Sequence, residues 1–226
     1  MRLTVIVPVY NEARTLRQVI DRLRELPLEL EIICVDDGST DGTRELLQLE
    51  IEPLVARVVY QRANAGKGSA IRAAIPYATG AAVVIQDADL ELDPGEFLRL
   101  LRKLESSPGC VVYGSRFRRG RGEASWAPWC ANRVLTLLTN LLFGCRLTDM
   151  ATAYKMFPGG VLPCLGLKCR GFEFEPEVTA RLLVRRVPIV EVPIAYMPRG
   201  RKEGKKIRWH DALVYVVWLV RCRLGG

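Results

Sequence analysis

The chain is organised around the stretch Val83-Val84-Ile85-Gln86-Asp87-Ala88-Asp89-Leu90-Glu91, in which an apolar run leads directly into alternating acids. Such a run predicts a buried strand that ends in carboxylates. In an open α/β sheet, ligands collect beyond the carboxyl ends of the strands, and side chains two apart on an extended segment point the same way. Asp87, Asp89 and Glu91 are therefore expected to converge on one hard cation, such as Mg²⁺ or Mn²⁺ with phosphate oxygens. The alternative is a solvated acidic turn before a helix capped at Asp93-Pro94.

The first half of the chain repeats the order strand, loop, helix. Three earlier strands are expected at 3–9, 31–37 and 55–60, and apolar residues at helical spacing follow the first of them. Strands that alternate with helices predict an α/β fold with a mainly parallel central sheet, right-handed crossovers and flanking helices. The loops after successive strands then share one edge of the sheet, so acids from three strand ends are expected to meet there.

Two of these loops contain glycine, and their spacing disfavours several families of nucleotide-binding enzymes. The segment 36–43 combines glycines for a tight turn with side chains that can cap a helix. Gly66-Lys67-Gly68 precedes a helix expected at 69–77 but lacks the spacing of a P-loop, and no G-x-G-x-x-G follows the first strand. Both ATP hydrolysis by a P-loop and a dinucleotide-dependent dehydrogenase are disfavoured. A receiver-like phosphoacceptor domain would not need the long segment that follows.

The second half of the chain is organised differently. Another strand is expected at 110–116, followed by a basic, glycine-rich loop at 116–122. The segment 171–177 begins a helix, and the favourable position of acids at the positive end of a helix is sufficient explanation for some of its glutamates. A last strand at 187–195 is interrupted by Pro188 and Pro193, which predicts an edge position.

The segment 131–143 predicts a helix that is apolar on most sides. Burial in the core is one interpretation. The neighbouring Trp126, Trp129 and basic loop fit an interfacial, lipid-facing helix equally well. No apolar run approaches the ~20 residues that a membrane-spanning helix needs.

Composition is ordinary for a globular protein, with 226 residues of which 49% are hydrophobic and 26% charged, and favours one large α/β domain. The net charge is +8, and much of the excess lies after Tyr196. The basic residues there are Arg199, Arg201, Lys202, Lys205, Lys206, Arg208, Arg221 and Arg223, against Glu203 and Asp211. A basic tail beside an apolar segment predicts phosphate-bearing partners, whether lipid, nucleotide or nucleic acid.

The seven cysteines are odd in number and contain no C-x-x-C pair, so they are expected to be reduced packing residues of a cytosolic protein. A single histidine, His210, makes a zinc site unfavourable. The first residues lead directly into a strand pattern and lack the features of a signal peptide.

Five short motifs, taken in order, resemble the family 2 glycosyltransferases of the GT-A fold. They are Pro8-Val9-Tyr10-Asn11-Glu12, the segment 35–43, the segment 64–68, Asp87-Ala88-Asp89 and Gly114-Ser115-Arg116. Each motif is weak alone, but their order and spacing are specific and cover most of the chain. The segments 149–155 and 171–175 are similar to those of the polyprenyl-phosphate sugar synthases, such as dolichyl-phosphate mannose and glucose synthases. The resemblance implies metal-dependent, inverting transfer of a hexose from a GDP- or UDP-sugar to a polyprenyl phosphate.

The resemblance also implies roles for individual residues. The nucleotide sugar would be bound by Pro8, Tyr10, Glu12, Asp37 and Lys67. The diphosphate would be held through Mg²⁺ or Mn²⁺ by Asp87 and Asp89, with Glu91 standing where the mannose synthases carry glutamine. Arg116 would face the acceptor phosphate, and the donor site would be closed over by Arg199, Arg201 and Lys205.

The chemistry follows from charge. A metal held by Asp87 and Asp89 would stabilise the departing diphosphate, and a phosphate acceptor is largely dianionic at neutral pH. A hydroxyl acceptor would need a general base, for which Asp149 is the best candidate; with a phosphate acceptor it need only orient the acceptor or the sugar. The expected catalytic set is therefore Asp89, Arg116 and Asp149.

We interpret the chain as a single domain, 1–226, with a nucleotide-sugar half at 1–115, an acceptor half at 116–197 and a basic tail and helix at 198–226. The expected location is the cytoplasm, at the cytoplasmic face of an anionic membrane. A soluble enzyme with a hydroxyl acceptor is the alternative. A nucleic-acid-binding protein is less favoured, because the basic residues lack interleaved aromatics apart from Trp209.

Overall fold

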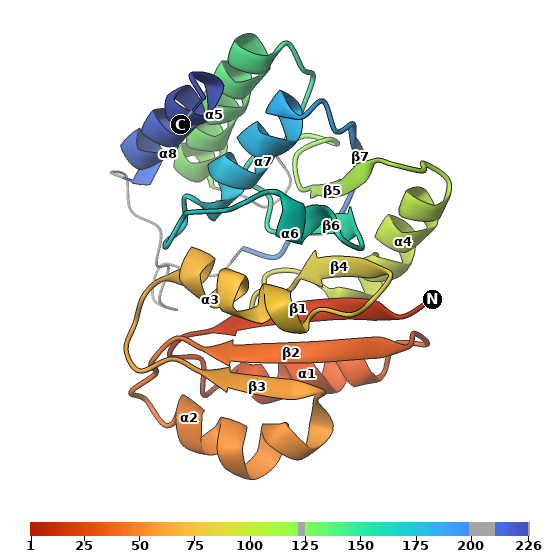
Figure 1. Cartoon of the computed structure of the whole chain (residues 1–226), viewed down its shortest axis with the longest axis vertical. Coiled ribbons are helices and arrows are strands. Elements are labelled where there is room, and N and C mark those ends of the chain that lie inside the picture. Colours follow the sequence, from red (N-terminus) through yellow and green to blue (C-terminus); the bar gives the residue numbers. More distant parts are fainter. Residues whose placement is uncertain (122–124, 199–210, 226) are drawn as a thin grey trace.

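Seven strands form one sheet in the order β3-β2-β1-β4-β6-β5-β7 in the computed structural model, which describes residues 1–121, 125–198 and 211–225 (Figure 1). The strands are β1 (Leu3–Val9), β2 (Leu30–Asp36), β3 (Arg57–Tyr60), β4 (Ala82–Ile85), β5 (Val111–Ser115), β6 (Lys155–Pro158) and β7 (Ile189–Pro193). Neighbouring strands are parallel except that β6 lies antiparallel between β4 and β5. The predicted mainly parallel sheet is confirmed, and so is the edge position of the last strand.

Helices cover both faces of this sheet. The α-helices are α1 (Leu16–Arg24), α2 (Thr43–Leu46), α3 (Lys67–Ala74), α4 (Phe97–Glu105), α5 (Trp126–Phe143), α6 (Val161–Cys164), α7 (Phe174–Val184) and α8 (Asp211–Arg223). Short turns of other helical types adjoin three of them, namely η1 (Leu47–Ile51), η2 (Glu52–Leu54), η3 (Ile75–Tyr77) and η4 (Pro94–Glu96). The predicted cap before α4 is present, since the Asp93 side chain accepts from the Gly95 N–H at 2.9 Å.

The central strand β1 is buried on both faces. Leu3, Val5 and Val7 enter a core that contains residues of α1 and α4. Ile6, which points to the other face, packs in a second core with residues of α3, α6 and α7. A strand covered by helices on both sides is apolar along its whole length, and this pattern made the strand at 3–9 recognisable in the sequence.

The helices α5, α7 and α8 pack together in a separate cluster at one end of the sheet (Figure 1). Leu135 of α5, Ala180 of α7 and Leu219 of α8 meet in one core cluster. The outer side of α5 is different, because Leu137 and Leu141 are 59% and 75% exposed. Burial in the core is therefore confirmed for one face of this helix, and a lipid-facing role for the exposed face stays a prediction. Within the described ranges, no helix has both the length and the apolar composition that crossing a membrane requires.

The loop before α3 joins the two halves of the chain. The helix begins at Lys67, two residues before its predicted start, directly after Gly66 with a φ of +96°. The N–H of Gly68 donates to the Gly171 carbonyl oxygen at 3.1 Å. A Cβ atom on Gly66 would lie 2.5 Å from the Arg170 carbonyl oxygen, so only glycine allows this close approach.

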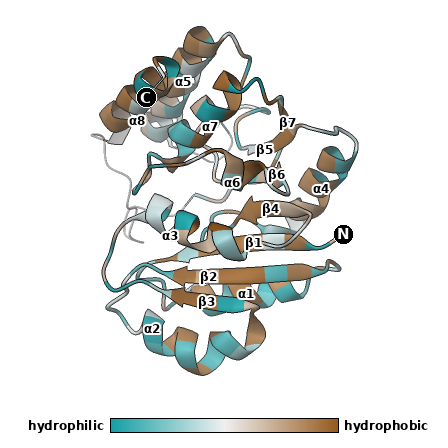
Figure 2. Cartoon of the chain, in the orientation of Figure 1, coloured by the Kyte–Doolittle hydropathy of each residue, from teal (hydrophilic) through white to brown (hydrophobic). Residues whose placement is uncertain are grey.

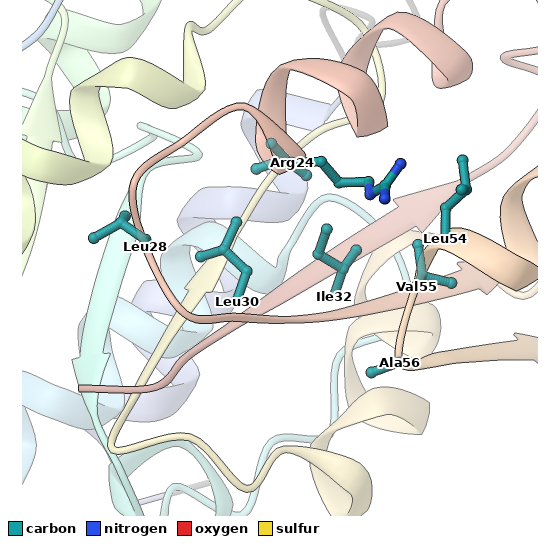
Figure 3. A pocket seen from close by; sticks show the side chains of 8 residues that line it. Arg24, Leu28, Leu30, Ile32, Leu54, Val55 and Ala56 are labelled. Carbon is teal, nitrogen blue, oxygen red and sulfur yellow. The ribbon is translucent and has the colours of Figure 1, made fainter.

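A cavity of about 200 Å³ lies at the opposite end of the strands from these loops. It is bounded by the end of α1, the start of β2 and the segment before β3, and Figure 3 shows the side chains around it. The lining residues are Leu23, Arg24, Leu28, Leu30, Ile32, Leu54, Val55 and Ala56. It contains none of the acids predicted to bind a ligand.

We expect Gly66→Ala to lower the free energy of unfolding by about 3 kcal/mol, because the added methyl group meets a backbone carbonyl in a strained conformation. Gly42→Ala is the matched control, since its φ is +92° but no atom lies within 4 Å of the added Cβ. The control should lower the free energy of unfolding by only ~1–2 kcal/mol, because it strains the backbone at a positive φ without a steric clash. Urea unfolding followed by circular dichroism measures both, and equal losses would contradict the importance of the close approach.

Candidate active site

The loops that follow β1 and β2 are interlocked at the carboxyl edge of the sheet. The N–H of Glu12 donates to Thr43 Oγ1 at 2.9 Å. Pro8 is the second-to-last residue of β1, and Tyr10 and Glu12 follow that strand. These three residues, predicted to bind a nucleotide, therefore lie at the edge where ligands of such sheets collect.

Buried Asp37 supports the loop that carries Lys67. Its Oδ1 accepts from the Ala65 N–H and its Oδ2 from the Gly66 N–H, each at 2.8 Å. Burial raises the pKa of this carboxyl above its ordinary value, against the effect of the two hydrogen bonds. The structure thus places Asp37 beneath the loop, with both of its oxygens accepting from backbone.

The segment after β4 that carries the acids is not extended. The backbone turns over residues 88–92, and Leu90 has a left-handed φ of +62°. Asp89 Oδ1 accepts from the Glu91 N–H at 3.1 Å within this turn. The expectation that Asp87, Asp89 and Glu91 lie on one side of an extended segment is therefore wrong, because side chains alternate in this way only while the backbone stays extended.

Glu91 lies beside Tyr196, and Asp89 is also near this tyrosine. Burial and the neighbouring Glu91 carboxylate raise the pKa of the Tyr196 hydroxyl to about 12. Among the residues that the structure describes, no group of three or more His, Cys, Asp or Glu side chains is placed to hold a metal ion. Asp87 is 26% exposed and so remains accessible from solvent.

Lys67 bridges two carboxylates at this edge of the sheet. Its Nζ lies 2.7 Å from Asp87 Oδ1 and 3.3 Å from Glu175 Oε1. The other oxygen of Glu175 forms an ion pair with the fully buried Lys155. Burial opposes the charge of Lys67, but the two carboxylates raise its pKa above the ordinary value, whereas burial lowers the pKa of Lys155. Asp87, Lys67, Glu175 and Lys155 thus form a line of alternating charges.

Arg116 and Asp149 form a second ion pair, after the end of β5. Arg116 Nε lies 2.8 Å from Asp149 Oδ2, and Nη2 donates to Oδ1 at 2.9 Å and to the Ala151 carbonyl at 3.0 Å. The guanidinium lies over the rings of Phe117 and Tyr196, 5.1 and 5.2 Å from their centroids. Asp149 has no exposed surface, and both of its oxygens accept from Arg116.

Glu191 of β7 fixes the turn that carries Asp149. Its carboxylate accepts from the N–H groups of Thr148 at 2.9 Å and Asp149 at 3.0 Å. Burial raises the pKa of Glu191, although these hydrogen bonds oppose the shift. On the other side of the turn, Thr136 of α5 accepts from the Met150 N–H at 3.1 Å. The turn is therefore held from both the sheet edge and α5.

Lys155 links the two ion-pair networks, because its ammonium donates to the Thr152 carbonyl oxygen in the segment that follows Asp149. Lys67 and Asp87 thus lie at one end of a connected group, and Arg116 and Asp149 at the other. The residues predicted to close over the donor lie outside the described part of the chain; they are Arg199, Arg201 and Lys205.

Three charged residues of this site were not among those predicted from the sequence. Glu191 and Lys155 each stand in an apolar strand, which is a detectable signal because a buried charge is costly unless it is paired. Glu175 gave no such signal, since its place in the first turn of α7 already had a local explanation.

Comparison with known proteins gives a consistent result. The family model described as "Glycosyl transferase family 2" matches residues 4–165. Polyprenol monophosphomannose synthase of Mycolicibacterium smegmatis is 29% identical over an alignment that covers 99% of the chain and 89% of that protein. Undecaprenyl-phosphate 4-deoxy-4-formamido-L-arabinose transferase of Proteus mirabilis is 29% identical, with coverage of 90% of the chain and 62% of that protein.

A solved structure of similar fold is glucosyl-3-phosphoglycerate synthase from Mycobacterium tuberculosis, in complex with Mn²⁺, uridine diphosphate and phosphoglyceric acid. It superposes with a TM-score of 0.71 at 21% identity, over 98% of the chain and 78% of that protein. At this identity the likeness concerns the fold.

We expect Arg116→Lys to lower the free energy of unfolding by about 2 kcal/mol, because an ammonium cannot reproduce the two parallel hydrogen bonds to buried Asp149. Arg118→Lys is the control, since exposed Arg118 donates one side-chain hydrogen bond to the residues that the structure describes, from Nη1 to the Glu191 carbonyl oxygen at 3.0 Å. Its loss should stay within about 0.5 kcal/mol. Chemical denaturation of both variants measures these losses. An Arg116 variant as stable as the control would show that the two parallel hydrogen bonds to Asp149 do not stabilise the fold.

Proposed function

Because the chain belongs to glycosyl transferase family 2 and is therefore a glycosyltransferase, we propose that it transfers a hexose from a nucleotide-diphosphate sugar to a polyprenyl phosphate at a membrane surface. The GT-A fold expected from the motifs is the fold of the structure. Both relatives described above are named for a polyprenyl carrier, which supports the lipid acceptor.

The donor would lie against the loops after β1, β2 and β3. Pro8, Tyr10 and Glu12 border this region, and Asp37 holds the loop from which Lys67 projects toward Asp87. A nucleoside diphosphate gains negative charge as the sugar leaves it. Cationic groups fixed in advance at this position stabilise the transition state more than the bound substrate.

The carboxylates after β4 fit a divalent metal ion that binds together with the donor. Asp87 and Asp89 offer hard oxygen atoms, and Mg²⁺ is commonly held by one or two carboxylates plus substrate phosphates. This arrangement needs no third carboxylate, in keeping with the position of Glu91 beside Tyr196. When bound, Mg²⁺ or Mn²⁺ would act as a Lewis acid toward the departing diphosphate.

The acceptor phosphate would meet Arg116 through Nη1, the guanidinium nitrogen that makes no hydrogen bond within the described part of the chain. An oxygen of the phosphate attacks the anomeric carbon, the bond from that carbon to the diphosphate oxygen breaks, and in-line displacement inverts the anomeric centre. The acceptor, with a second pKa of ~6, is already largely dianionic at neutral pH. No proton has to be removed from it.

Asp149 is a positioning residue in this proposal. It is fully buried and both of its oxygens accept from Arg116, so it holds the guanidinium instead of taking a proton. Glu191 holds Asp149 in turn through its backbone N–H. A hydroxyl acceptor would require a general base, and this arrangement favours an acceptor that needs none.

The observation that carries the lipid acceptor is an exposed apolar stripe on α5 and α8. The stripe consists of Trp126, Val134, Leu137, Leu141, Leu213, Val217, Val220 and Leu224, each at least 39% exposed. Their spacing keeps them on one side of α5 and one side of α8, which lie side by side (Figures 1 and 2). Buried Thr136 on the inner side of α5 contacts the turn that holds Asp149, so a lipid bound along the outer side would lie on the helix that supports this turn.

A soluble hydroxyl acceptor is the second candidate, because the structural relative with bound phosphoglyceric acid is named for a small-molecule product. The deciding experiment supplies GDP- and UDP-hexoses with Mn²⁺ and compares polyprenyl phosphate in vesicles with soluble sugar acceptors. Transfer to the lipid alone is the expected result. Transfer to the soluble hydroxyl alone would replace the proposal with the second candidate.

Asp89→Asn is expected to reduce hexose transfer by ~10²-fold or more, since a neutral amide cannot offset the charge of the metal ion. Asp93→Asn is the matched control, because asparagine retains the cap that Asp93 makes at Gly95. Turnover with each donor is measured in Mg²⁺, in Mn²⁺ and in excess EDTA. Undiminished turnover in EDTA would exclude the metal requirement.

Leu137→Glu combined with Val217→Glu should abolish binding to vesicles, because both charges lie on the apolar stripe. The control is Leu49→Glu, which changes a leucine on η1 that is more exposed, at 79%, and lies outside the stripe. Co-sedimentation is measured with vesicles of anionic and of neutral lipid at low and high salt. The wild type should require anionic lipid and weaken with salt, since each basic residue near the surface contributes ~1 kcal/mol. Equal binding by the double variant would contradict docking through the stripe.

A further inference from the structure

The ammonium of Lys67 is shared between two carboxylates with different surroundings. Asp87, 2.7 Å away, is 26% exposed, whereas Glu175, 3.3 Å away, is 5% exposed. Lys67 itself is only 12% exposed. It has therefore one partner that a ligand from solvent can reach and one that is enclosed.

Asp87 is also a proposed ligand of the metal ion, so two cations compete for the same carboxylate. A divalent ion on Asp87 would repel an ammonium 2.7 Å from the same oxygen, and this repulsion is strong in a site of low effective dielectric constant. Glu175 offers Lys67 a second position that needs little movement. The arriving diphosphate adds negative charge that an ammonium binds well.

We propose that Lys67 occupies Asp87 as a counter-cation until metal and donor arrive, and then leaves Asp87, stays paired with Glu175 and gains the donor diphosphate. This inference rests on the proposed function, because it requires that a metal ion binds Asp87. Lys67 thereby keeps the empty site electrically balanced and becomes a ligand of the donor in the loaded site.

Glu175 and Lys155 hold the ammonium within reach during this exchange. Lys155 is fully buried, pairs with the second oxygen of Glu175 and also donates to the Thr152 carbonyl oxygen. The Glu175 carboxylate is thus fixed from behind by the segment that follows Asp149. Because the Glu175 carboxylate also pairs with Lys155, it attracts Lys67 less strongly. The Lys67 ammonium can therefore still contact the donor.

The test measures Mn²⁺ binding without nucleotide, by electron paramagnetic resonance of the free ion, and then binding of GDP and UDP at saturating Mn²⁺ by calorimetry. Lys67→Met should bind Mn²⁺ alone roughly tenfold more tightly, because the competing cation is gone. The same variant should bind the nucleoside diphosphate roughly tenfold more weakly, because an ammonium–phosphate contact is lost. Lys103→Met, which removes the same charge from α4 outside the site, should change neither affinity.

Glu175→Gln supplies the opposite change. With its second carboxylate removed, Lys67 should hold Asp87 more firmly, and Mn²⁺ alone should bind severalfold more weakly than to the wild type. Because this variant leaves buried Lys155 without its partner, Glu175→Gln with Lys155→Met keeps the experiment interpretable if the single variant does not fold. The double variant should show the same weaker binding of Mn²⁺.

The outcomes separate this inference from the proposed function. Unchanged or weaker Mn²⁺ binding by Lys67→Met, while the wild type binds Mn²⁺ and a nucleoside diphosphate, overturns the exchange alone. If the wild type binds neither, the proposed metal site fails and the exchange fails with it. Opposite shifts for the Lys67 and Glu175 variants support the exchange.

Discussion

The two ion pairs of Glu175 are the interaction on which the arrangement of the site depends. One oxygen meets Lys67 at the start of α3, and the other meets Lys155 at the start of β6. These segments are far apart in the sequence, and Glu175 itself belongs to α7. The start of α3 and the start of β6 are therefore anchored to the same carboxylate, which fixes their relation to each other.

Buried charges of this kind contribute little net stability, since the loss of hydration offsets most of the attraction between them. What the ion pairs contribute is the fixed orientation of the charged groups. Arg116 is held by Asp149, whose backbone is held by Glu191, and each charged group is thereby oriented before a substrate arrives. Groups that are already oriented need no reorganisation in the transition state, which is the main source of electrostatic catalysis.

Sequence patterns predicted the strands well because burial on both faces of a parallel sheet leaves a continuous apolar run, as in 3–9. They also located Asp87, Arg116 and Asp149, which follow strands or lie in recognisable motifs. The expectation of an extended segment failed at Leu90, where a left-handed residue turns the backbone between Asp89 and Glu91. A non-glycine residue in that conformation leaves no mark in the local pattern, since neighbouring contacts decide it.

The sequence did not predict β6. It determined by itself the α/β class, the other six strands and the family. These depend on periodicity and on motifs, which are local. Only the tertiary structure decided that Arg116 and Asp149 are partners, that Asp37 supports a loop, and that Glu175 joins Lys67 to Lys155. Each of these facts is a contact between residues 20 to 108 positions apart, and a pairing over such distances is set by how the helices and strands pack.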